Sequence, residues 1–526
     1  MGGDTERKRT KVARPAARVA AAALWLTVTL ASACSRSAPP VPPGFIQVDI
    51  ETSPSATDPR FSTDATSSRV NELVFDSLLK VDRDGQFIGD LADSFARTSP
   101  TELVFHLRHG IRFSDGRELT ARDVKFTYDS ILAPANLSPR RAAMVRLASI
   151  DARDPYTVVM TMRAQYAPAL ELGMQGIVPA GTAVRASTPR GSGPFMLTSF
   201  ARDEAAVLER NPYRPYSGPL ARGIVFKVVP DPTVRALELA EGVCDFAENN
   251  LEPYLLPYLI AQPGLEVSKS PGNGYRYLSF NFRDSRLKDV RVRRAIAYAI
   301  DRAAIVTSVR RGTARVATGM LSPENWAYDG DVKTYSYDPA RAAALLEEAG
   351  YPRGAGGMRN LAFVYKTTPD QARLGEVIQA MLARVGIRIT VRTNEFATFY
   401  SDIQNGNFDL TSMNWVGIND PNHYYMVFDS KMIPPAGYNR GAYANPAMDR
   451  LVEAGAVTLD PAERKTIYTK VQQLAAEELP YVSLWWDDTV VIMNRRLAGF
   501  QPYPNGSLRS LATVTLAGGS GAEPSR

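Results

Sequence analysis

The chain has few of the residues that build disulfide scaffolds and transition-metal sites. Its 526 residues include two cysteines, Cys34 and Cys244, and three histidines, His106, His109 and His423. A chain of this length can build a hydrophobic core without disulfides, so two cysteines do not indicate a disulfide framework. His106 lies in the alternating, strand-like run Leu103–Leu107, and His109 follows three residues later, a spacing that points to opposite strand faces. We expect no metal site and no cofactor.

Strong charge and catalytic motifs are lacking as well. The formal net charge is +6, and the first 33 residues carry +4 of it, so the rest of the chain is nearly balanced. A surface with balanced charge has no large positive potential to attract the phosphates of a nucleic acid, so we expect no nucleic-acid partner. The sequence contains no Gly-x-Ser-x-Gly, His-Glu-x-x-His, Cys-x-x-Cys or glycine-rich phosphate loop. We therefore expect no enzymatic activity, although a secreted hydrolase built on paired carboxylates stays open.

One apolar run stands out near the amino terminus. Val19–Leu30 follows a basic stretch and precedes Ala31-Ser32-Ala33-Cys34. A run of this length is short for a membrane span, which needs about 20 apolar residues, and the pattern predicts a signal peptide over residues 1–33. The small residues before Cys34 resemble a lipobox, which implies a lipid anchor on that thiol; ordinary cleavage that leaves Cys34 free is the alternative. Residues 34–43, rich in Pro and Ser, would form a tether outside the cytoplasm.

The body mixes helices and strands. Asp338-Pro339 begins one helix, with Asp as the N-cap and Pro in the first turn. The apolar spacing from Leu374 to Val385 predicts another, which Gly386 ends. Tyr275–Phe282 is rich in aromatic residues, as strands often are. Since one core rarely exceeds about 250–300 residues, we predict an α/β protein with two or more lobes.

A set of motifs, in a fixed order along the chain, carries a resemblance to a known family. They are Asp58-Pro59, Glu72–Leu79, Leu107–Gly116, Leu119–Val124, Gly191–Phe195, Arg210–Tyr213, Leu278–Asn281, Val290–Ala295, Ala299–Asp301, Tyr337–Pro339 and Tyr443–Asp449. Together they resemble the extracellular solute-binding proteins of family 5, the peptide, nickel and related binders of ABC importers. The resemblance covers residues 46–510.

The resemblance implies an α/β fold of the periplasmic-binding-protein-like II type, a Venus flytrap that closes over a solute. Lobe I would comprise residues 44–272 and 487–512 with an added subdomain near 85–190, and lobe II residues 273–486. Two chain crossings would fall near Gly274 and near Leu484–Trp486, and residues 513–526 would form a flexible tail. The closed form, a monomer, would deliver its solute to a membrane permease and its ATPase.

The resemblance also points to a ligand loop. Met413–Pro421 resembles the loop in which peptide binders place an aspartate three residues after a tryptophan, to pair with the peptide's amine. Here Ile418 holds that position and the loop is one residue shorter. Trp415, Asn419 and Asp420 are therefore candidates. For Trp415 the alternative is core packing, and for Asp420 a turn before proline.

Four further residues complete the candidate site. His423 could line the cleft or start a helix, and Asn439-Arg440 could grip a carboxylate through the arginine fork or lie on the surface. Lys366 lies roughly where some dipeptide binders place a cation. Nickel is disfavoured because histidines are not clustered. We predict an importer's binding protein for short peptides or similar polar solutes, with a subunit that signals to a membrane sensor as the alternative.

Overall fold

The computed structural model describes residues 1–3, 41–215 and 220–517. The predicted signal peptide beyond Gly3, Cys34 and most of the tether lie outside these residues. The chain divides into an amino-terminal unit, Met1–Pro43, and a body, Gly44–Arg526, and only the body is considered below. Among the described residues, every helix is too short or too polar to cross a membrane.

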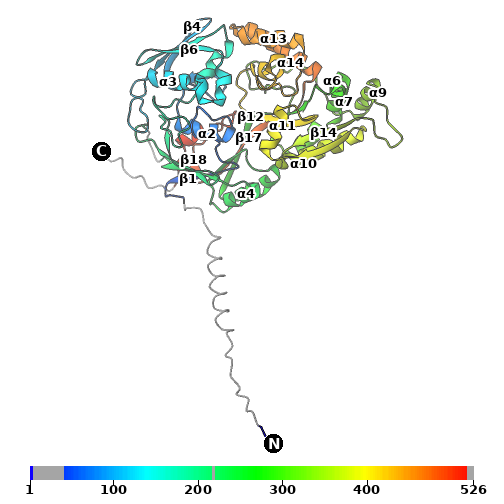
Figure 1. Cartoon of the computed structure of the whole chain (residues 1–526), viewed down its shortest axis with the longest axis horizontal. Helices are drawn as coiled ribbons and strands as arrows, with labels where there is room; N and C mark the ends of the chain where they lie inside the picture. The colour runs from blue at the N-terminus through cyan, green and yellow to red at the C-terminus, as the bar shows by residue number, and fades with distance from the viewer. Residues whose placement is uncertain (4–40, 216–219, 518–526) are drawn as a thin grey trace. The chain divides into compact units, whose positions relative to one another are not determined.

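In the described part of the body, one mixed sheet of eleven strands organises the fold (Figure 1). Ten of them lie in the order β15-β14-β16-β12-β17-β11-β1-β10-β9-β8, and β13 pairs with β17. The strands are β1 (Phe45–Ile50), β8 (Phe195–Ala201), β9 (Ala205–Arg210), β10 (Gly223–Val228), β11 (Phe246–Glu248), β12 (Leu265–Phe280), β13 (Ala314–Val316), β14 (Ala362–Thr367), β15 (Arg388–Thr393), β16 (Leu410–Trp415) and β17 (Tyr481–Asn494).

Two long antiparallel strands hold this sheet together. β12 has 16 residues and β17 has 14, and they pair from Leu265↔Asn494 to Ser279↔Tyr481. Figure 1 shows them between β1 and α2 on one side and β14 and α10 on the other. Their register shifts between Ser270 and Gly274 and again between Arg276 and Tyr277. Both predicted crossings, near Gly274 and near Leu484–Trp486, lie on these strands.

Separate hydrophobic cores form on different stretches of the chain. One draws on residues between Leu78 and Ile177 and packs beneath a second sheet. That sheet has the order β4-β5-β7-β6, with β4 Ala92–Ser99, β5 Glu102–Leu107, β6 Leu147–Asp154 and β7 Thr157–Met162. Another core joins Ile46 to Val514, and the largest joins Tyr275 to Trp486. The largest core lies within the range predicted for lobe II, and the core from Ile46 to Val514 uses segments predicted for lobe I. The exact lobe boundaries remain a prediction.

The helices begin where their capping residues predict. The side chain of Asp338 accepts from the Arg341 amide at the start of α9, and Gly386 has φ +87° after α10, as N-caps and left-handed C-terminal glycines require. The principal helices are α2 (Ala65–Val74), α3 (Ala121–Leu132), α4 (Pro232–Ala240), α7 (Val290–Ala299), α9 (Pro339–Glu348), α10 (Ala372–Arg384), α11 (Phe396–Gln404), α12 (His423–Phe428), α13 (Pro446–Val457) and α14 (Pro461–Glu478).

The packed body extends past residue 512, where we predicted a flexible tail. Val514 is fully buried in the core that begins at Ile46. Thr515–Leu516 (β19) pairs with Leu497–Ala498 (β18). The apolar side chain of Val514 and this short ladder tie the segment down, and residues 518–526 lie outside the described part.

Candidate functional site

The large sheet has a point at which its connections diverge. From β14 the chain passes through α10 to β15 on one side, then through α11 to β16 on the other side of β14. These three strands are parallel. In α/β sheets, ligands bind in the crevice outside the carboxyl ends of strands at such a point. Here those ends carry Lys366 and Thr367 on β14 and Asn414 and Trp415 on β16.

Trp415 is the centre of an aromatic cluster at this edge. Its ring stacks on Tyr277 of β12, with centroids 6.1 Å apart and an angle of 13° between planes. The rings of His423 and Tyr438 approach it at 4.5 and 5.5 Å. Its Nε1 is buried and makes no hydrogen bond to any described residue. Both predicted roles therefore have support, because the ring packs while its polar atom lacks a partner.

Arg440 lies against the same rings. Its Cζ is 4.9 Å from the centroid of Trp415, 5.3 Å from that of Tyr400 and 5.4 Å from that of Tyr438. Its Nη1 contacts the Met413 sulfur at 3.6 Å, and its Nη2 donates to the Tyr400 hydroxyl at 3.3 Å. Nε is buried with no partner among the described residues. Arg440 is thus buried among aromatic faces, and both ends of its fork are in use.

His423, the first residue of α12, completes the cluster. Burial, together with the Arg440 charge, lowers the pKa of His423 to about 4, so the imidazole is neutral near pH 7. Its Nε2 is buried and lacks a partner within the described chain. A neutral ring offers one donor and one acceptor nitrogen to a neighbouring polar group.

Asp420 is engaged inside the protein. Both of its oxygens accept from the Arg464 guanidinium of α14, at 2.6 and 2.7 Å, and Oδ1 also accepts from the Asn422 amide at 2.7 Å. The side chains of Asp420 and Arg464 are each 7% exposed. Such a two-pronged, buried pair leaves the carboxylate little freedom to meet a ligand's amine, so these contacts favour a structural role.

Asn439 and Lys366 also have internal partners. The Asn439 amide donates to the backbone carbonyls of Asp429 and Tyr443, and its oxygen accepts from the Tyr443 amide. Lys366 pairs with Asp402 of α11, with 2.6 Å between Nζ and Oδ2. Their hydrogen bonds favour structural roles for both.

Asn419 lies between β16 and α12 and is half-buried. Its backbone carbonyl accepts from the Asn325 amide at 3.2 Å. The structure therefore brings Trp415, His423 and Arg440 together and leaves Asn419 beside them on the loop. Asp420, Asn439 and Lys366 are bonded elsewhere.

Three tyrosines of this cluster were not among the predicted site residues. Tyr277 comes from β12, Tyr400 from α11 and Tyr438 from the segment after α12. The alternating aromatics of Tyr275–Phe282 were a usable signal, since Tyr275 and Tyr277 lie on one strand face. No local pattern marks Tyr400 or Tyr438, because folding alone brings them to Arg440.

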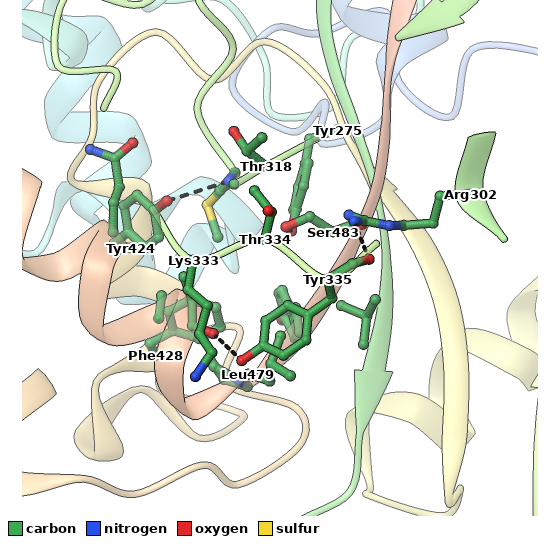
Figure 2. A pocket seen from close by; sticks show the side chains of 18 residues that line it. Tyr275, Arg302, Thr318, Lys333, Thr334, Tyr335, Tyr424, Phe428, Leu479 and Ser483 are labelled. Carbon is green, nitrogen blue, oxygen red and sulfur yellow. Dashed lines mark hydrogen bonds between the residues drawn. The ribbon is translucent and has the colours of Figure 1, made fainter. Parts of the chain in front are cut away.

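A different pocket lies deeper in the largest core (Figure 2). It encloses about 40 Å³, and a buried water needs roughly 10–15 Å³. Figure 2 shows Arg302, Tyr335 and Ser483 on its wall, where Arg302 donates to the carbonyls of Tyr335 and Ser483 at 2.8 Å. The pocket suits a few water molecules and is too small for a peptide.

The fold is that of a two-lobed solute-binding protein of type II, as predicted. A family model, bacterial extracellular solute-binding proteins, family 5 Middle, matches residues 86–431. The chain therefore belongs to the family 5 extracellular solute-binding proteins, which confirms the resemblance seen in the sequence.

Curated relatives and solved structures agree with this family assignment. "Probable di/tripeptide-binding protein 5" of Pseudomonas aeruginosa is 26% identical over 93% of this chain and 98% of that protein. The oligopeptide-binding protein AppA of Bacillus subtilis, solved with a nonapeptide, has a TM-score of 0.80 and 25% identity, and the match covers 90% of this chain and 98% of that one. NikZ of Campylobacter jejuni, solved with Ni(L-His), has the same fold with a TM-score of 0.81 and 24% identity, over 90% of this chain and all of that one.

Proposed function

We propose that this protein captures short peptides for an ABC importer, with the solute held at the carboxyl edge of β14 and β16. The observation that carries the proposal is the set of unpartnered atoms there, Nε1 of Trp415, Nε2 of His423 and Nε of Arg440. A buried polar group without a partner costs about 1–3 kcal/mol. A peptide backbone supplies carbonyls for the two donors and either a donor or an acceptor for the imidazole. The surrounding aromatic faces suit apolar side chains.

The relatives support the peptide as solute. A di/tripeptide-binding protein matches nearly the whole chain, and AppA was solved with a nonapeptide bound. Peptide capture by this protein needs no covalent step and no cofactor, so we do not propose enzymatic activity. Transfer of the solute to a permease and its ATPase is the step that follows capture.

We propose that the solute lies between two lobes, residues 44–272 with 487–517 and residues 273–486, where the packing of Val514 moves the last boundary beyond 512. Contacts across this division support a closed form. Arg146 donates to the Tyr425 hydroxyl at 3.1 Å, and Asn422 donates to the Tyr166 hydroxyl at 3.4 Å. A solute that touches both sides stabilises the closed form by its differential affinity for closed over open. The proposal also includes the location and state of the protein: it works outside the cytoplasm as a monomer, and a lipid on Cys34 anchors it to a membrane.

Native mass spectrometry of the purified mature chain, mixed with a synthetic library of di- to pentapeptides, tests the proposed function. We expect one-to-one complexes, with Kd values confirmed by calorimetry. Arg388, exposed on β15, gives a control variant, Arg388→Gln, that should bind the same peptides. Failure to retain any peptide would overturn the proposal. Cleaved products would instead indicate a hydrolase.

A further inference from the structure

Besides Arg440, a second arginine lies near the carboxyl end of β16, and it is Arg276 of β12. Arg276 is directly opposite Asn414 of β16 and Trp485 of β17. Residues directly opposite in a sheet project from the same face, and neighbours along a strand alternate. Arg276 therefore shares a face with Asn414, while Tyr275 and Tyr277 share the other face with Trp415.

The side chain of Arg276 has no hydrogen bond or ion pair with any other residue in the described part of the chain. Its Nε is buried, and its Cζ lies 5.9 Å from the Trp485 ring. The residue is only half-buried as a whole, so its outer nitrogens are not sealed off. Within the described ranges, all the donors of this guanidinium are therefore without a protein acceptor.

The carboxylate beside Arg276 is already engaged. Oδ1 of Asp487 accepts from Arg310 Nη2 at 2.8 Å and from Trp485 Nε1 at 2.9 Å. Burial lowers the pKa of Arg276, Asp487 and Asp370 raise it, and the Arg310 charge lowers it further. Arg276 thus lies near two carboxylates, Asp487 and Asp370, yet neither forms an ion pair with it within the described chain. Asp487 pairs with Arg310 instead.

A charged side chain that is partly withdrawn from water without an acceptor costs free energy. Buried guanidinium groups elsewhere in the body have acceptors: Arg293 donates to the backbone carbonyls of Leu287 and Leu479, and Arg464 pairs with Asp420. Both terminal nitrogens of Arg440 have contacts within the protein. The guanidinium nitrogens of Arg276 have no hydrogen-bond acceptor among the described residues. Of Arg440 and Arg276, the latter is thus better suited to a two-pronged contact with a carboxylate.

We propose that Arg276 binds the carboxylate of the solute, which for a peptide is the α-carboxylate. This inference rests on the proposed function and assigns a direction to the bound chain. The peptide crosses the carboxyl edge of the sheet, its body against the aromatic cluster on one face and its carboxyl end at Arg276 on the other. A free carboxyl terminus then becomes a requirement for tight binding.

The test compares the best-bound library peptide with its C-terminal amide, by calorimetry. Losing a hydrogen bond to a charged group costs enough to weaken binding roughly 10- to 100-fold, so the wild-type protein should prefer the acid by that factor. Arg276→Gln should bind acid and amide alike, and Arg276→Lys should recover part of the preference. Arg388→Gln, the same change on an exposed residue of β15, should retain the full preference.

A second readout separates a binding role from a structural one. Because the Arg276 guanidinium has no acceptor among the described residues, Arg276→Gln should leave the thermal midpoint of the peptide-free protein unchanged or raise it. A fall of several degrees, as after loss of a structural ion pair, would contradict the proposal. Equal binding of acid and amide by the wild type would overturn the role of Arg276 and leave peptide capture standing. Absence of peptide binding would overturn both.

Discussion

Glu171 is a buried carboxyl group whose charge state should set how the stability of the protein depends on pH. It lies in the 3-10 segment Ala167–Met174, and its burial, with the Asp420 carboxylate nearby, raises its pKa from 4.5 to about 8, although Arg464 opposes the shift. Asp420 already takes the Arg464 charge through two hydrogen bonds. The folded protein therefore keeps Glu171 protonated at a pH where the unfolded chain ionises it.

The direction in which stability changes with pH follows from the number of protons that each state binds. Between about pH 4.5 and 8 the native state holds one more proton than the unfolded state, so stability falls by about 1.4 kcal/mol per pH unit as the pH rises. Glu171→Gln imitates the protonated side chain and removes this penalty. The carboxyl group is buried, but the residue as a whole is half-buried, so solvent screens part of this effect. We therefore expect the variant to be more stable than wild type by about 2–3 kcal/mol at pH 7.

Urea unfolding measured between pH 4.5 and 8.5 checks this expectation. The difference in free energy of unfolding between Glu171→Gln and wild type should be near zero at pH 4.5 and should grow towards pH 8. Glu376, exposed on α10, supplies the control: Glu376→Gln should change stability little at any pH. If the Glu171→Gln difference is flat across the range, Glu171 is not a buried, protonated carboxyl group and the reasoning fails.

Three further substitutions test the site and its surroundings. Trp415→Ala should weaken peptide binding roughly 10- to 100-fold with an unchanged circular dichroism spectrum, and unchanged affinity by calorimetry would remove Trp415 from the site. Asp420→Asn should lower the free energy of unfolding by about 3–5 kcal/mol because it leaves Arg464 buried and unpaired, and a large loss of affinity without loss of stability would make Asp420 a ligand contact instead. Arg146→Ala should weaken binding about five-fold by removing a hydrogen bond to Tyr425 that favours closure, and X-ray scattering profiles identical to wild type at partial saturation would contradict it.

Local sequence predicts much of this fold. The caps at Asp338 and the stop at Gly386 lie where predicted, because side-chain capping and left-handed glycine are local chemistry. The order of the strands in the sheet, in contrast, is not predicted by local sequence. It depends on pairings between residues more than 200 apart, such as Phe246 with Met493, which entered only through the family resemblance.

The candidate site was less predictable for the same reason. Trp415 and Arg440 were predicted from their residue types and from the resemblance, and the fold does bring them together. Asp420 and Lys366 were chosen by the same means, yet each forms an ion pair with a residue at least 36 positions away. A charged side chain in a sequence can be assigned to a ligand only after its internal partners are known. Arg276 is the opposite case. Its guanidinium lacks an acceptor among the described residues, and only the three-dimensional structure reveals this.

The loop after Trp415 leads to a last prediction, about the other end of the peptide. Ile418 holds the position at which peptide binders of this family place an aspartate, and it is 5% exposed within the largest core. The nearest loop carboxylate, Asp420, is bonded to Arg464. The described loop therefore offers no free carboxylate to an α-ammonium group, whereas Arg276 offers a free guanidinium to the opposite end. N-acetylation of the best-bound peptide should change its Kd less than about three-fold, well below the effect of C-terminal amidation. Calorimetry that shows acetylation to be the more damaging change would require an amine-binding carboxylate that this loop does not provide.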